Sequence, residues 1–138
     1  TELLDIGCGS GILGIAGLLL GARSATGVDI DELAVKTARE NGEMNGFTEP
    51  KYTVFQGNLT DKVSGKYDVV VANIVADIIV MFTKDVGRFL KDDGIYITSG
   101  IIDTREQDVL DAFEKYGFEV VGRHESCGWL CFETRLKK

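Results

Sequence analysis

Near the start of the chain, one carboxylate and three glycines have the spacing of a ligand-binding loop. In the stretch LLDIGCGSGILG, Asp5 is followed at alternate positions by Gly7, Gly9 and Gly11, which gives the pattern DxGxGxG. Glycine permits positive φ and close approach of a ligand to the backbone, and the N–H groups at a helix start attract anions. A structural turn needs only one or two glycines, so this spacing favours a loop that faces a ligand.

Two classes of cofactor fit the loop. Read from Gly9, the stretch GSGILG matches the GxGxxG pattern of dinucleotide-binding proteins, and Asp29 follows 20 residues later. Read from Asp5, the pattern places a carboxylate beside the ligand, where it would repel a pyrophosphate but stabilise the sulfonium and ammonium groups of S-adenosylmethionine. Charge therefore favours S-adenosylmethionine over a nicotinamide dinucleotide.

Three further residues are candidates for contacts with the nucleoside part of such a cofactor. Asp29 ends the run ATGVD, where its carboxylate can accept hydrogen bonds from both ribose hydroxyls, and Ile30 offers an apolar side to the adenine. Asn58, in FQGN, can bond the adenine amine, although a turn role fits it equally well. Asp31 is expected to cap the helix that follows.

Alternating strands and helices must position these residues. Apolar runs predict seven strands, at residues 3–6, 24–30, 52–56, 67–73, 94–99, 118–124 and 129–134. Helical spacing predicts helices at residues 12–20, 31–45, 74–90 and 103–116, with Leu33, Ala34, Ala38 and Met44 on or near one apolar face of the second.

This order predicts an α/β protein with a Rossmann-like, doubly wound and mostly parallel sheet. The short turn ESCG before the last strand predicts an antiparallel hairpin at the C-terminal end. Ligands bind at the carboxyl ends of parallel strands, where the glycine loop, Asp29 and Asn58 all lie.

Composition limits the kinds of partner. The 138 residues, of which 44% are hydrophobic, suit a single domain, and the net charge of −7 opposes nucleic acid and favours basic proteins or a cationic cofactor. Cys8, Cys127 and Cys131 are too sparse for a disulfide framework, and with His124 they lack the paired spacing of a zinc site. No apolar run is long enough for a membrane span, so we expect a cytoplasmic protein without a bound metal.

Four stretches, taken in order, carry a family resemblance: LLDIGCGSGILGIAGLLLGA, GVDIDELAVKTARENGEMNG, YDVVVANIVADII and SGII. Together they resemble the catalytic domain of class I S-adenosylmethionine-dependent methyltransferases, and among these the ribosomal protein L-eleven methyltransferases. The glycine motif is shared by the whole class, whereas VVVANI, ADII and SGII are more specific. The resemblance implies methyl transfer to lysine or N-terminal amines of a basic large-subunit ribosomal protein, with Gly7, Asp29 and Asn73 at cofactor-contacting positions.

The resemblance also implies a particular domain organisation. We expect residues 1–138 to form the catalytic domain, without the upstream substrate-recognition region and the threonine-bearing glycine loop that the family carries. The family pattern further places an acidic residue before the tryptophan of the last strand, and this chain has Gly128 there, before Trp129.

Methyl transfer is an in-line displacement, so the enzyme chiefly positions a neutral amine. Asn73, at the end of a predicted strand, carries an uncharged amide that can orient both the cofactor and the amine; its alternative role is to cap the next helix. Ile74 and Trp129 are candidates for the substrate pocket, and Trp129 fits a packing role as well. The remaining alternatives are a methyltransferase acting on a small molecule or another protein, and a non-catalytic cofactor-binding module.

Overall fold

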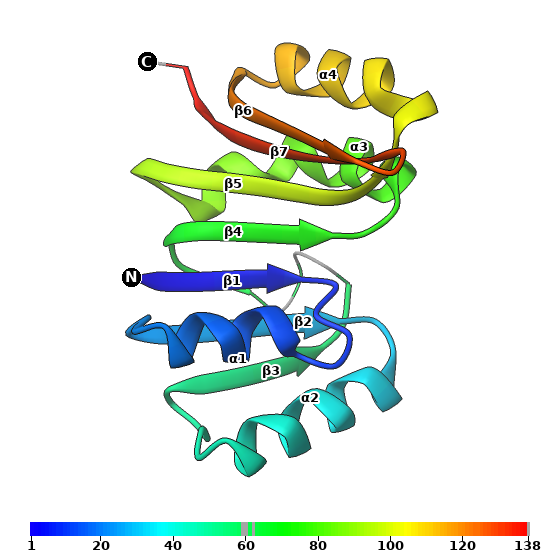
Figure 1. Ribbon diagram of the computed structural model, residues 1–138. Coiled ribbons are helices and arrows are strands. Elements are labelled where there is room, and N and C mark those ends of the chain that lie inside the picture. The colour runs from blue at the N-terminus through cyan, green and yellow to red at the C-terminus, as the bar shows by residue number, and fades with distance from the viewer. Residues whose placement is uncertain (59–60, 62, 138) are drawn as a thin grey trace.

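A computed structural model describes residues 1–58, 61 and 63–137, and within these residues seven strands form one sheet of order β3-β2-β1-β4-β5-β7-β6 (Figure 1). The strands are β1 Glu2–Ile6, β2 Ser24–Asp29, β3 Tyr52–Gln56, β4 Tyr67–Asn73, β5 Leu90–Ile102, β6 Phe118–Ser126 and β7 Trp129–Leu136. All pairs among β1 to β5 are parallel, and β7 runs antiparallel to both β5 and β6. The predicted fold class and C-terminal hairpin are confirmed.

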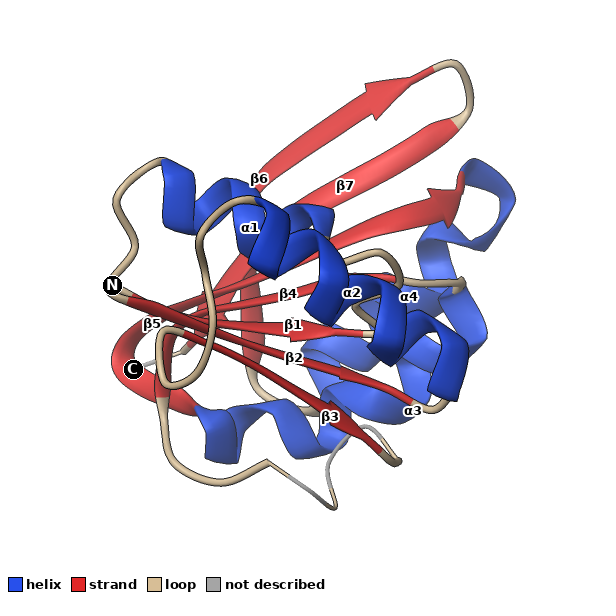
Figure 2. Cartoon of the chain, turned by 90° about the horizontal axis from the view of Figure 1, so that it is seen from below, coloured by secondary structure: helices blue, strands red, loops and turns tan. Residues whose placement is uncertain are grey.

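Helices cover both faces of this sheet. They are α1 Ile12–Leu19, α2 Glu32–Met44, α3 Ala76–Val86 and α4 Glu106–Lys115, with short 3₁₀ segments η1 Gly87–Phe89 and η2 Asp103–Arg105. Figure 2 shows α1 and α2 on one face and α3 and α4 on the other, which is the doubly wound arrangement. None of the described helices combines the length and the apolar character needed to cross a membrane.

The two faces have separate cores. Beneath α3 and α4, the buried ring of Tyr96 lies 5.5 to 6.4 Å, centroid to centroid, from the rings of Phe82, Phe113 and Phe118. Beneath α1 and α2, small and medium side chains pack around Tyr52. The second core contains three alanines, Ala22, Ala25 and Ala38, among its buried residues.

Helix α2 turns a different side to the sheet from the one predicted. Its buried residues are Val35, Ala38 and Gly42, whereas Leu33 and Met44 are 68% and 82% exposed. A Cβ on Gly42 would lie 2.6 Å from Cδ2 of Tyr52, so the helix rests on the tyrosine ring through a glycine. The expectation for Leu33 and Met44 was wrong because this close contact decides the rotation of the helix, and a glycine carries no hydrophobic signal.

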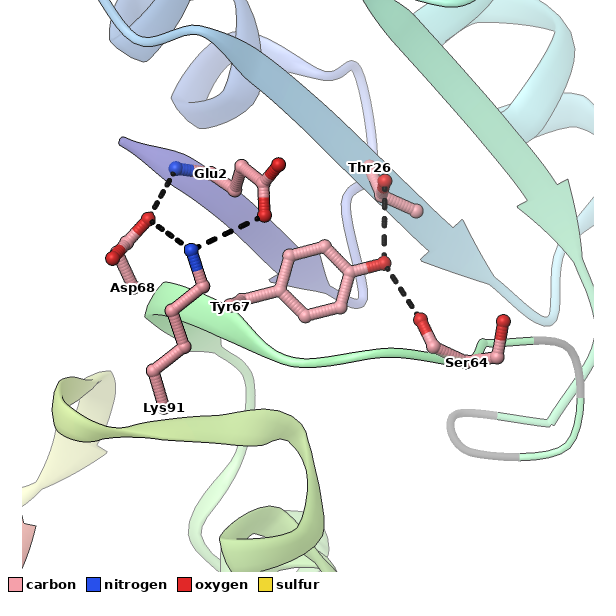
Figure 3. A network of polar contacts seen from close by, with 6 residues as sticks. All are labelled: Glu2, Thr26, Ser64, Tyr67, Asp68 and Lys91. Atoms are coloured by element: carbon pink, nitrogen blue, oxygen red, sulfur yellow. Dashed lines mark hydrogen bonds and ion pairs between the residues drawn. The ribbon is translucent and has the colours of Figure 1, made fainter.

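A polar network joins the strands at the edge of the sheet opposite the glycine loop (Figure 3). Lys91 Nζ lies 3.4 Å from Glu2 Oε2 and 3.2 Å from Asp68 Oδ2, and the Glu2 backbone N–H donates to Asp68 Oδ2 at 2.8 Å. This N–H and the Lys91 ammonium lower the pKa of Asp68 below its usual value. Because the network links β1, β4 and β5 far from the glycine loop, we interpret it as structural.

Candidate functional site

The glycine loop runs from the end of β1 to the start of α1. Gly7, Gly9 and Gly11 have φ of +68°, +53° and +84°, as their spacing predicted. The N–H groups of Gly7 and Cys8 both donate to the carbonyl of Val28, at 2.8 and 3.1 Å, which fastens the loop to β2. Three left-handed residues in five explain why glycine is required there, since other residues adopt this conformation at a cost.

Asp29 holds the loop from the end of β2. Its Oδ2 accepts the N–H of Gly9 at 2.9 Å, and its Oδ1 accepts the N–H of Asp31 at 2.9 Å. Each carboxylate oxygen has a second lone pair, so Asp29 can still accept hydrogen bonds from a ligand. Asp31 caps α2 through its own Oδ1, which accepts the N–H of Leu33 at 3.0 Å, as predicted.

A pocket of about 640 Å³ opens beside this loop. It is lined by Gly7, Asp29, Ile30, Asn58, Ile74, Ile78, Met81, Phe82, Lys84 and Asp85. Five of the residues selected from the sequence therefore meet at one cavity, whose volume lies in the range of small-molecule sites. The Asn58 amide is turned in part toward its own loop, donating to Asp61 Oδ2 at 3.2 Å.

The apolar wall that α3 gives this pocket was missed from the sequence. Ile78 and Phe82 match the core stripe of a helix, and that pattern does not separate core from pocket. Met81 falls off the stripe and is 65% exposed in the structure. An apolar residue outside a helix's core stripe was the signal that could have indicated a binding surface.

Asp5 does not line this pocket, although the sequence placed it among the cofactor-binding residues. Its side chain is buried beneath the loop, with 1% exposed, and Oδ2 has no hydrogen-bond partner. Burial raises the pKa of Asp5 to about 7; the N–H of Gly14 opposes the shift and the charge of Asp29 adds to it. The neighbouring Cys8 thiol is also buried, which raises its pKa to about 12. These groups form a buried polar cluster directly under the glycine loop.

Asn73 ends β4 at the same edge of the sheet and is exposed, next to Ile74 in the pocket wall. Helix α3 begins at Ala76 with Val75 as its N-cap residue, and no side chain makes a capping hydrogen bond there. The alternative role of Asn73 as a helix cap is therefore excluded. Its amide oxygen faces Gly100 of β5.

Trp129 lies farther along the same edge, at the start of β7. It pairs with Ile102 of β5 across the sheet, and with 55% of its surface exposed it is not a core packing residue. It does not line the 640 Å³ pocket. In the part of the chain that the structure describes, no three His, Cys, Asp or Glu side chains come together as a metal site.

Comparison with known proteins identifies a family whose members are similar to this chain. The family model described as Ribosomal protein L11 methyltransferase (PrmA) matches residues 1–137. The chain belongs to this family. Two relatives named ribosomal protein L11 methyltransferase, from Desulforamulus reducens and Clostridium perfringens, are 48% identical over 131 residues and 47% identical over 137 residues.

A solved structure supports the family's fold in this chain. The crystal structure of ribosomal protein L11 methylase from Lactobacillus delbrueckii subsp. bulgaricus superposes with a TM-score of 0.95 at 31% identity, and the match covers 99% of this chain and 70% of that one. A putative RNA methyltransferase from Pyrococcus horikoshii, at 21% identity and a TM-score of 0.81, shares the fold. The matches to the two relatives cover 95% and 99% of this chain but only 42% and 43% of theirs.

Proposed function

We propose that this chain is the cofactor-binding and catalytic part of a protein N-methyltransferase, which transfers a methyl group from S-adenosylmethionine to amines of a large-subunit ribosomal protein. The observation that carries the proposal is the family match over residues 1–137. The pocket beside the glycine loop is a cavity in which the cofactor can bind. We place the protein in the cytoplasm with its ribosomal substrate, and the net charge of −7 suits a basic protein partner rather than nucleic acid.

The residues present fit the cofactor. The pocket volume suits a nucleoside with an amino-acid tail, and Asp29 stands at its edge with free lone pairs for the ribose hydroxyls. Ile30 gives an apolar side for the adenine, and Asn58 can bond its amine. The loop glycines at Gly7 and Gly9 keep side chains away from the ligand. Asp5 is buried and does not line the pocket, so we do not assign it a direct contact with the cofactor.

S-adenosylmethionine supplies an electrophilic methyl group when it is bound. The chain must then hold a neutral amine in line with that methyl, and for a lysine with a reference pKa near 10.4 the neutral form costs about 4.6 kcal/mol at pH 7. The apolar wall formed by Ile74 and α3 lowers this cost by disfavouring the ammonium. We assign Asn73 to orient the amine through its amide oxygen, and Trp129 to contact the substrate protein.

Two measurements test the proposal. Isothermal titration calorimetry on this chain should show binding of S-adenosylhomocysteine and no comparable binding of NAD, because the family match over residues 1–137 favours S-adenosylmethionine over a dinucleotide. A full-length protein that contains this chain should transfer labelled methyl groups from S-adenosylmethionine to a purified large-subunit ribosomal protein. Tighter binding of NAD would exclude the methyltransferase, and labelling of small molecules alone would exclude the ribosomal substrate.

A further inference from the structure

The residues Asn73 and Ile74, at the end of β4, are enclosed by two glycines, one in the loop after β1 and one in β5. Following β1, Gly7 is so close that a Cβ on it would lie 2.6 Å from Cγ2 of Ile74. On the other side, in β5, a Cβ on Gly100 would lie 2.6 Å from Oδ1 of Asn73. Real Cβ atoms essentially never approach other atoms so closely, so both glycines leave space that the Asn73–Ile74 pair occupies.

The backbone of β5 departs from regular pairing at the point where this contact is made. The parallel register with β4 ends at the pair Asn73 and Ser99, and the antiparallel register with β7 shifts between Thr98 and Ile101. Gly100 lies inside this irregularity, with φ of +76°. Irregularities of this kind bend a strand and redirect side chains, and they are frequent beside active sites.

We infer that Gly100 is a positioning residue, whose missing side chain leaves the space that holds the Asn73 amide in its orientation toward the methyl-transfer site. The inference rests on the proposed function, because it gives the Asn73 amide a role in catalysis. Positive φ alone does not account for the close contact between Gly100 and the Asn73 amide. Gly117 also has a positive φ, of +81°, but no atom lies within 4 Å of a Cβ added there. Gly100 differs from Gly117 because the side-chain amide of Asn73 lies against it.

An alanine at this position should move the amide rather than the strand. Oδ1 is at the free end of the Asn73 side chain and can rotate away, whereas the backbone of Ile74 is farther off, with its carbonyl oxygen at 3.5 Å. The left-handed backbone strain of Gly100→Ala is matched by that of Gly117→Ala, which meets no neighbour. The pair of variants therefore separates loss of the amide's position from backbone strain.

The experiment uses a full-length protein that contains this chain, with four variants: Gly100→Ala, Gly117→Ala, Asn73→Ala and the double variant Gly100→Ala/Asn73→Ala. We expect Gly100→Ala to lower kcat about 10- to 100-fold and to change the Kd for S-adenosylhomocysteine less than about threefold, because only the in-line geometry is disturbed. Gly117→Ala should keep the wild-type kcat. The double variant should be no slower than Asn73→Ala, since the amide that Gly100 positions is already gone.

A second readout does not depend on turnover. In ¹⁵N-labelled protein, the side-chain amide signals of Asn73 are identified by their loss in Asn73→Ala; they should shift in Gly100→Ala and stay in place in Gly117→Ala. Unmoved amide signals, an unchanged kcat in Gly100→Ala, or an additive double variant would each overturn the inference. If the wild type labels no ribosomal protein, the proposed function fails, and the amide signals still decide whether Gly100 positions Asn73.

Discussion

At the scale of single residues, Asp29 combines two roles, because the carboxylate that can bind the ribose also holds Gly9 at 2.9 Å. We expect Asp29→Ala to weaken S-adenosylhomocysteine binding by about 1.5–3 kcal/mol, through loss of charge-assisted hydrogen bonds. Asp31→Ala is the matched control: it should cost about 1 kcal/mol of stability through the lost cap and leave affinity nearly unchanged. Calorimetry and thermal unfolding separate the two. A large affinity loss in Asp31→Ala alone would move the ribose contact to Asp31.

Asp5 should make the free energy of unfolding depend on pH. Its folded-state pKa of about 7 lies above the unfolded value of 3.8, so protonation of Asp5 favours the folded state. This contribution to the free energy of unfolding is complete below about pH 4 and is lost as the pH rises to about 7. The full effect is about 4 kcal/mol. Asn is neutral at every pH and can still accept the N–H of Gly14, so the stability of Asp5→Asn relative to wild type should increase from pH 4 to 7.

Urea unfolding of wild type and Asp5→Asn at pH 4.5, 6 and 7.5 measures this difference. Asp31→Asn serves as the control for the substitution itself, because Asp31 is exposed and asparagine is also a good helix N-cap residue. A constant difference between Asp5→Asn and wild type would mean that Asp5 is ionised throughout and has a partner for its charge.

Residue types and spacing predicted part of the pocket lining, because strand ends in a parallel sheet share an edge. Gly7, Asp29 and Asn58 lie at or just after the ends of three different strands and line one cavity. The position of Asp5 could not be predicted in the same way. Whether a carboxylate at a strand end faces a ligand or is covered depends on how α1 and Tyr52 pack over it, and this packing is not local in sequence.

At the scale of elements, glycines determine how closely helices approach the sheet. Gly42→Ala puts a Cβ 2.6 Å from the rigid Tyr52 ring and 3.1 Å from the carbonyl of Phe47, so we expect a loss of about 1–3 kcal/mol in stability despite alanine's better helix propensity. Gly17→Ala in α1 is the matched control, because its Cβ meets only the flexible end of Leu3 at 3.1 Å. It should change stability by less than about 1 kcal/mol.

Thermal or urea unfolding of both variants measures this contrast. Equal stability losses would show that the Leu3 side chain is as constrained as the tyrosine ring. A gain in Gly42→Ala would show that α2 can move off the sheet without cost.

Element boundaries were predictable where β-branched and aromatic residues dominate a run, and the prediction failed where charge or sterics decide. The strands at residues 52–56 and 67–73 coincide with β3 and β4. Strand β5 begins at Leu90, earlier than predicted, because Lys91 and its acidic neighbours weaken the β pattern while Leu90 still pairs with Tyr67 of β4. Helix α3 begins two residues late, at Ala76, since Val75 is still extended as its N-cap residue.

At the scale of the whole molecule, several elements of this chain contribute to one pocket. Its lining comes from the loop after β1, the ends of β2 and β3, the residue after β4 and helix α3. The polar network at the opposite edge ties β1 and β4, which flank part of the pocket, to β5. Cofactor binding should therefore be a property of these residues by themselves.

We expect turnover to require contacts with the substrate protein in addition to cofactor binding. This chain matches 43% of the Clostridium perfringens relative, so that relative has a large part outside the match. Binding energy from parts remote from the reacting amine brings that amine into line with the methyl group, and its loss lowers turnover more than it lowers cofactor affinity. We therefore expect this chain to bind S-adenosylhomocysteine within about tenfold of the full-length relative, and to methylate a ribosomal protein at least about 100-fold more slowly.

The segment of that relative that aligns with this chain, produced alone, is the matched control, because it differs from its parent only in length. Both short forms should share the same pattern: cofactor affinity retained and kcat/KM strongly reduced, measured by calorimetry and by transfer of labelled methyl groups. Full turnover by either short form would place substrate recognition within the 138 residues, near Trp129 and Asn73. Loss of cofactor binding in both would mean instead that the pocket beside the glycine loop is completed by residues from the rest of the protein.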